Sequence, residues 1–192
     1  MTHRIYIAED NQNLLDEAFR EIMALYNLNL KVDAKGEIQS TTEQAYQFRR
    51  VDLPNANIGK YWRELQITGE DLVVVDLHLG DYVDPISREK KSIPFTGRDI
   101  LSLFQREKLS GNMQGLEKVL VATSLPLEVD FENPSAFYVG LRGFDVYGME
   151  KGRDKTGRIT SYGISLAQKI SQIYDNFGGV EEMPLNAGWR NE

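Results

Sequence analysis

The chain contains no cysteine, and only two of its 192 residues are histidine. The missing cysteines exclude disulfides, thiolate metal sites and cysteine nucleophiles. The two histidines, His3 and His78, lie far apart in the sequence and show no metal-ligand spacing. No apolar run approaches the roughly 20 residues of a membrane-spanning helix, and no basic leader precedes the first strand pattern. We therefore expect a cytoplasmic protein that does not enter a membrane.

The chain also lacks a basic run that could follow a phosphate backbone, so nucleic acid is a poor candidate partner. Acidic residues outnumber basic ones by 29 to 22, which gives a formal net charge of −7. A hydrophobic content of 41% over this length suffices for one sizeable core. We expect a single domain over residues 1–177, with insertions near 50–62 and 80–96, followed by a C-terminal tail at 178–192.

Strand and helix patterns alternate along the chain. Strand patterns lie at 4–8, 28–32, 72–76, 119–123 and 144–149. Helical spacing begins at Asn11 and recurs at 41–48, 61–65, from Gly97, at 134–141 and at 162–174. Such alternation forms right-handed βαβ units around a parallel sheet. We predict a flavodoxin-like, doubly wound α/β fold with five parallel strands in the order 2-1-3-4-5 and helices on both faces.

Three of the buried-strand patterns end on polar side chains. The first stops at Glu9 and Asp10, the third at Asp76, and the fourth at Thr123 and Ser124. Ligands of open parallel sheets bind outside the carboxyl ends of the strands, and these three strands are neighbours in the predicted order. Carboxylates a few ångströms apart repel by about 4 kcal/mol per pair at an effective dielectric constant near 20, and a cation relieves that repulsion. The sequence therefore predicts a divalent metal beside a reactive aspartate.

Five segments of the chain carry family-like motifs: 5–11, 73–79, 96–101, 121–124 and 143–147. In these segments, and in their order along the chain, the sequence resembles the receiver domains of two-component response regulators. In this comparison Asp76 falls on the phosphoacceptor position and Thr123 on the hydroxyl position of the fourth strand. The resemblance covers most of residues 4–176.

The resemblance implies a magnesium-dependent phosphoacceptor. Glu9, Asp10 and Asp76 would hold Mg²⁺ together with the backbone carbonyl of His78, with water completing the octahedron. Asp76 would take a phosphoryl group from a histidine kinase or phosphotransfer protein, while the metal neutralises charge on the phosphoryl oxygens.

Further residues acquire roles from the same resemblance. The Thr123 hydroxyl would bond a phosphoryl oxygen, and Tyr147 would follow it into the vacated space as a switch. The family's lysine position falls on Glu150, and Lys151 comes one residue later. Either a bulge brings Lys151 to the site or the site lacks its usual cation, because a one-residue slip turns a strand side chain to the opposite face.

Three functions compete at this point. The first is a stand-alone receiver whose output passes through protein–protein contacts. It would be a phosphoacceptor signalling protein rather than an enzyme, although self-catalysed phosphoryl transfer and autodephosphorylation would be possible. The second is a pseudo-receiver binding module that does not accept phosphate, which Glu150 and the lengthened loop after Asp76 favour. The third is a metal-dependent phosphatase or nuclease. It lacks the second aspartate, two residues beyond the nucleophile, that haloacid-dehalogenase-type enzymes need.

Overall fold

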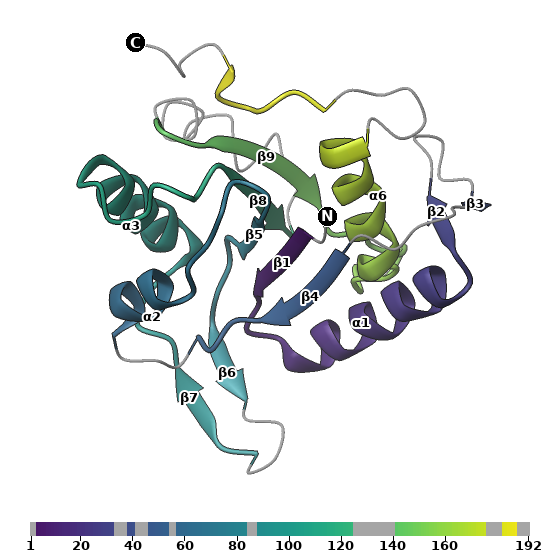
Figure 1. The fold of residues 1–192 in the computed structure, drawn as a ribbon. Coiled ribbons are helices and arrows are strands. Elements are labelled where there is room, and N and C mark those ends of the chain that lie inside the picture. Colours follow the sequence, from purple (N-terminus) through teal and green to yellow (C-terminus); the bar gives the residue numbers. More distant parts are fainter. Residues whose placement is uncertain are drawn as a thin grey trace.

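A parallel sheet lies at the centre of the molecule (Figure 1). This computed structural model describes residues 3–32, 38–40, 46–53, 57–83, 88–124, 141–175 and 182–187. Within these residues the sheet has five strands, in the spatial order β4 (Tyr46–Arg50), β1 (His3–Ala8), β5 (Leu72–Asp76), β8 (Lys118–Thr123) and β9 (Asp145–Glu150). All four pairings are parallel. Numbered by their appearance in the chain, the sheet strands follow the predicted order 2-1-3-4-5.

Helices cover both faces of the sheet, as predicted. Helices α1 (Gln12–Asn27) and α6 (Tyr162–Asp175) pack on one face, and α2 (Ile58–Glu64) and α3 (Gly97–Leu109) pack on the other (Figure 1). Strand side chains alternate between these two layers. In β5, for example, Leu72 and Val74 join the α1–α6 layer, whereas Val73 and Val75 join the α2–α3 layer. The continuous apolar run at 72–76 thus reflects a strand buried on both faces.

The second strand of the sheet is not the segment that the sequence indicated. Leu30–Val32 forms β2, which pairs antiparallel with β3 (Ile38–Ser40) outside the main sheet. Its place is taken by β4, so the predicted helix at 41–48 is wrong from Tyr46 onward, and residues 41–45 lie outside the described part. The side chains of Tyr46 and Phe48 alternate with polar neighbours and pack against the α1–α6 layer. The segment is too short for its hydrophobic period to distinguish a strand from a helix. Its parallel pairing with β1 makes it a strand.

Both predicted insertions contain regular structure. Helix α2 begins at Ile58, earlier than predicted, because the Asn57 side chain caps it by accepting a hydrogen bond from the Lys60 N–H at 3.1 Å. The segment after β5 contains an antiparallel pair, β6 (Asp81–Val83) and β7 (Lys90–Ser92). The predicted helix at 134–141 lies outside the described residues, apart from Leu141.

The lack of periodicity after Gly178 predicts a loosely held tail, but its described part, residues 182–187, is hydrogen-bonded to edge strand β9. The Leu185 N–H donates to the Val146 carbonyl at 2.6 Å, and the Asn186 side chain accepts from the Val146 N–H at 3.0 Å. The Asn186 amide also donates to two backbone carbonyls at 2.8 Å and is 1% exposed. An edge strand leaves a row of backbone groups without hydrogen-bond partners, and residues 185 and 186 supply partners for some of these groups. Such pairing requires no apolar periodicity in the segment.

In the described part of the chain, none of the helices combines the length and apolar character required to cross a bilayer.

Candidate functional site

Three strands carry a charged side chain to the same corner of the sheet. In each strand two alternate residues pack in the α1–α6 layer, and the next residue of that series is charged. The series are Ile5-Ile7-Glu9, Leu72-Val74-Asp76 and Tyr147-Met149-Lys151. Because parallel strands all end at one edge of the sheet, these charges meet there.

Lys151 joins the two buried carboxylates of this corner. Its Nζ lies 2.5 Å from Glu9 Oε2 and 2.7 Å from Asp76 Oδ2. Glu9, Asp76 and Lys151 are 1%, 4% and 4% exposed. The remaining carboxylate oxygens accept backbone hydrogen bonds at 3.1 Å, Glu9 Oε1 from Asn11 and Asp76 Oδ1 from His78. Each buried charge is therefore paired and hydrogen-bonded, which burial requires.

Asp10 extends this corner toward solvent. It is partly exposed, and its Oδ2 accepts a hydrogen bond from the Gly80 N–H at 2.7 Å. One carboxylate oxygen from each of Glu9, Asp10 and Asp76 lies within 4.8 Å of the others; we call these three residues the acidic cluster. Three carboxylates beside one ammonium group leave the cluster net negative. Hard oxygen donors with excess negative charge suit a hard divalent cation such as Mg²⁺.

Burial and the neighbouring charges shift the ionisation of this corner. Burial raises the pKa of Glu9 to about 8, with the ammonium of Lys151 opposing the rise and the charge of Asp76 adding to it. Burial alone would lower the pKa of Lys151, but the two carboxylates outweigh it and the pKa is raised. Lys151 therefore stays charged.

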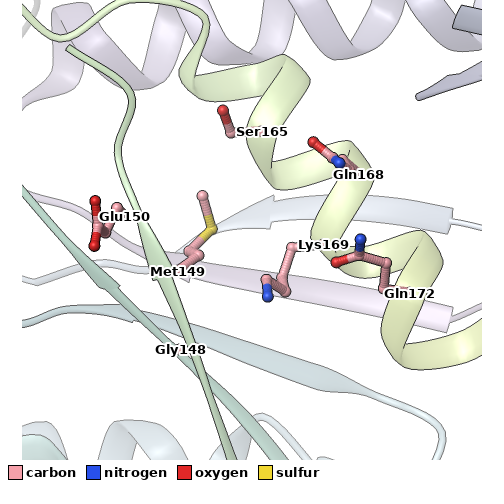
Figure 2. Close-up of a pocket in the computed structure, with 7 residues that line it drawn as sticks. All are labelled: Gly148, Met149, Glu150, Ser165, Gln168, Lys169 and Gln172. Carbon is pink, nitrogen blue, oxygen red and sulfur yellow. The ribbon is translucent and has the colours of Figure 1, made fainter. Parts of the chain in front are cut away.

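Lys151, and not Glu150, faces the acidic cluster. Glu150 is still paired with Thr123 in the β8–β9 ladder, and the Lys151 N–H continues that ladder to the Thr123 carbonyl at 2.7 Å. The alternation of β9 runs on without a bulge, so Glu150 is exposed and Lys151 is buried. Glu150 instead lines a cavity of about 380 Å³ between β9 and α6, where Figure 2 places it beside Met149 and across from Ser165 of α6.

The other predicted residues lie around the same corner. Thr123 is fully buried and follows Ala122, the residue of β8 that is in register with Asp76. Tyr147 is 6% exposed and lies within the α1–α6 layer, four residues before Lys151. His78 contributes its backbone N–H to Asp76, as noted above, and its side chain is exposed. The roles assigned to these residues stay predictions.

Two neighbours of the site escaped the sequence analysis. The ring of Tyr162, at the start of α6, lies under the Lys151 ammonium, with Nζ 5.2 Å from the ring centroid. Gly80 supplies the N–H that Asp10 accepts. Nothing in the linear sequence links residue 162 to residue 9, because only the packing of α6 on the sheet brings them together.

Gly97, at the start of α3, lies against the backbone of Asp76. A Cβ atom at this position would lie 2.1 Å from the Asp76 carbonyl oxygen, so α3 approaches the end of β5 as closely as a glycine permits. Thr96 caps α3 in a reciprocal arrangement with Asp99, which holds the start of the helix at this place.

No protein-family model matches the sequence, and no curated protein matches it. Among solved structures, the chain is similar to a response regulator receiver domain from Rhodospirillum rubrum, with a TM-score of 0.50 and 13% identity over 88% of this chain and 94% of that chain. A phosphorylated cyanobacterial phytochrome response regulator, RcpA, gives a TM-score of 0.49 and 12% identity over 90% of this chain and 93% of that chain. The chain thus has the fold of a response regulator receiver domain, as its sequence motifs indicated.

Proposed function

We propose that this protein is a cytoplasmic receiver, which accepts a phosphoryl group on Asp76 from a histidine kinase or phosphotransfer protein. One observation carries this proposal: within a receiver-type fold, Lys151 Nζ bridges Glu9 and Asp76 inside an acidic cluster at the carboxyl edge of the sheet. A buried carboxylate with a cation and a second acidic group beside it is equipped for nucleophilic attack on phosphorus.

In the proposed reaction a carboxylate oxygen of Asp76 attacks the phosphorus of the donor. A P–O bond to Asp76 forms, the bond to the donor nitrogen breaks, and the donor imidazole keeps that electron pair. Glu9, Asp10, Asp76 and the His78 carbonyl would hold Mg²⁺, which supplies positive charge for the phosphoryl oxygens. Lys151 would move its contact from Asp76 to a phosphoryl oxygen, because the carboxylate loses its own charge when it is phosphorylated and the phosphoryl oxygens carry the negative charge.

The output would begin at Thr123. Its hydroxyl would bond a phosphoryl oxygen, which adds a charge of about −1.5 to −2 to the site. Tyr147 would respond as the switch residue, and the change in surface would reach an unidentified partner protein by direct contact.

Phosphoryl uptake from a small donor tests the proposal. The protein is incubated with acetyl phosphate and Mg²⁺, and its intact mass is compared with that of Asp76→Asn and of Asp52→Asn, a control that removes an exposed carboxylate. We expect a gain of one phosphate in the parent and the control, and none in Asp76→Asn. A gain that persists in Asp76→Asn would refute Asp76 as the acceptor.

One observation favours the alternative, a pseudo-receiver binding module. Lys151 already contacts both buried carboxylates, and backbone N–H groups donate to further oxygens of the acidic cluster. The protein's own groups therefore partly compensate the negative charge of the cluster without a metal. If this alternative holds, the parent gains no phosphate and calorimetry detects no Mg²⁺ binding at millimolar concentrations.

A further inference from the structure

We infer that Tyr162 is a positioning residue for Lys151, and that the face of its ring holds the lysine ammonium over Glu9 and Asp76. The contact itself does not depend on any reaction. Its consequence for phosphoryl transfer rests on the function proposed above.

The contact is buried and has the geometry of a cation–π interaction. Tyr162 is 2% exposed, Lys151 is 4% exposed, and the Nζ-to-centroid distance is 5.2 Å. A cation within about 6 Å of a ring face is attracted to it, and the attraction grows when both groups are removed from water. The Lys151 ammonium is thus held from two sides, by the carboxylates and by the ring.

The ring restrains Lys151 without using any of its donors. An ammonium group has three N–H bonds, and Lys151 directs hydrogen bonds to Glu9 and Asp76. A carbonyl or carboxylate in place of the ring would compete for an N–H. An aromatic face leaves the remaining donor available for an oxygen that arrives at Asp76.

The charges of Glu9 and Asp76 act on the Tyr162 hydroxyl. The charges of Glu9 and Asp76 add to burial in raising its pKa, so the phenol stays neutral and can only be a donor toward these carboxylates. Among the described residues it has no hydrogen-bond partner. A buried hydroxyl without a partner is costly, and a phenylalanine would avoid that cost. The contact with Lys151 requires only the aromatic ring, which a phenylalanine would also provide.

Helix α6 holds Tyr162 in this place. The Gly163 N–H donates to Glu21 Oε2 of α1 at 2.7 Å, which pairs the first turn of α6 with a carboxylate. A Cβ atom at Gly163 would lie 2.3 Å from the Ala18 carbonyl oxygen, so the two helices touch through their backbones. The ring is therefore preorganised by packing rather than by its own hydrogen bonds.

Three variants separate positioning from plain core packing. Tyr162→Phe keeps the ring, and Tyr162→Leu removes it. Tyr26→Leu is the matched control, because Tyr26 belongs to the same core layer, is 5% exposed and also has a buried hydroxyl without a partner within the described residues. Its ring contacts Tyr46 and Phe48 instead of the acidic cluster.

The first readout is the NMR spectrum of the Lys151 side chain, which needs no phosphoryl transfer. A ring face shifts nearby protons upfield, so we expect upfield-shifted ε-methylene protons in the parent, Tyr162→Phe and Tyr26→Leu, and a return toward ordinary values in Tyr162→Leu. The second readout is the rate of phosphoryl uptake from acetyl phosphate. We expect Tyr162→Leu to lose about tenfold in maximal rate with KM little changed, and Tyr162→Phe to stay within about twofold.

Ordinary Lys151 shifts in the parent would overturn the inference, and this holds even if Tyr162→Leu fails to fold. An equal loss of rate in Tyr26→Leu and Tyr162→Leu would also overturn it, because core damage would then explain both. A parent that takes no phosphate but shows the expected Lys151 shifts would instead refute the proposed function and leave the Tyr162 contact standing.

Discussion

Removing the Lys151 charge is the perturbation whose outcome follows most directly from the geometry. Lys151→Met keeps the length of the side chain but deletes the ammonium that lies 2.5 Å from Glu9 and 2.7 Å from Asp76. Breaking a buried pair by removing one partner costs about 3–5 kcal/mol, because a buried charge is left uncompensated. Carboxylate oxygens of Glu9 and Asp76 lie within 4.8 Å of each other, and two unit charges about 4 Å apart repel by about 4 kcal/mol at an effective dielectric constant near 20. We expect a loss of about 3–5 kcal/mol in the free energy of unfolding.

Urea unfolding followed by circular dichroism measures this loss, with Lys155→Met as the control. Lys155 is an exposed lysine of the same loop, and its substitution should change the free energy of unfolding by less than about 0.5 kcal/mol. Millimolar Mg²⁺ should restore part of the stability of Lys151→Met, since a divalent cation can take over the neutralisation of the acidic cluster. A loss below about 1 kcal/mol in Lys151→Met, as for a surface ion pair, would refute this reasoning.

Three further predictions concern the surroundings of the site. Burial acts to raise the pKa of Asp71, but hydrogen bonds from Arg4 and from a neighbouring threonine outweigh it, so the pKa is lowered. The stability that this carboxylate contributes is present above its unfolded pKa near 4 and is lost as the pH falls through its folded pKa. In urea unfolding between pH 7 and 3, the free energy of unfolding of Asp71→Asn should therefore fall less steeply with decreasing pH than that of the parent. Gly97→Ala should destabilise the protein by about 1–3 kcal/mol in thermal unfolding and slow phosphoryl uptake, because its Cβ would lie 2.1 Å from the Asp76 carbonyl oxygen. Asn186→Ala should raise amide hydrogen exchange along the edge of β9 while exchange in β5 stays unchanged, since the amide of Asn186 bonds three backbone groups around that strand.

The acidic cluster was predictable because its position depends on short-range rules. Apolar runs fix where β1 and β5 end, and the parallel arrangement brings those ends together. Glu9, Asp10 and Asp76 therefore converge without knowledge of any side-chain contact. The helical spacing also predicted that α1 begins near Asn11. It left Asp10, Asn11 and Asn13 open as the cap, and the structure shows the Asn11 side chain accepting from the Leu14 N–H.

The errors arose where distant parts of the chain decide the outcome. Tyr46–Arg50 is a strand because it pairs with the edge of β1. The segment is too short for its hydrophobic period to predict a strand. The described part of the tail is held on β9 by the Leu185 N–H and the Asn186 side chain, and such contacts leave no periodic signal in the sequence. The choice between Glu150 and Lys151 needed the register of β9 on β8, which is set by the packing of Tyr147 and Met149 against α6.

The central claim is that Asp76 and a divalent cation form one phosphoryl-accepting site with Lys151. Fluorine NMR with beryllofluoride, which mimics an acyl phosphate on a carboxylate, tests it most directly. We expect protein-bound fluorine resonances that need Mg²⁺ and that vanish in Asp76→Asn. Bound resonances without Mg²⁺, or none in the parent at saturating Mg²⁺ and beryllofluoride, would contradict the claim.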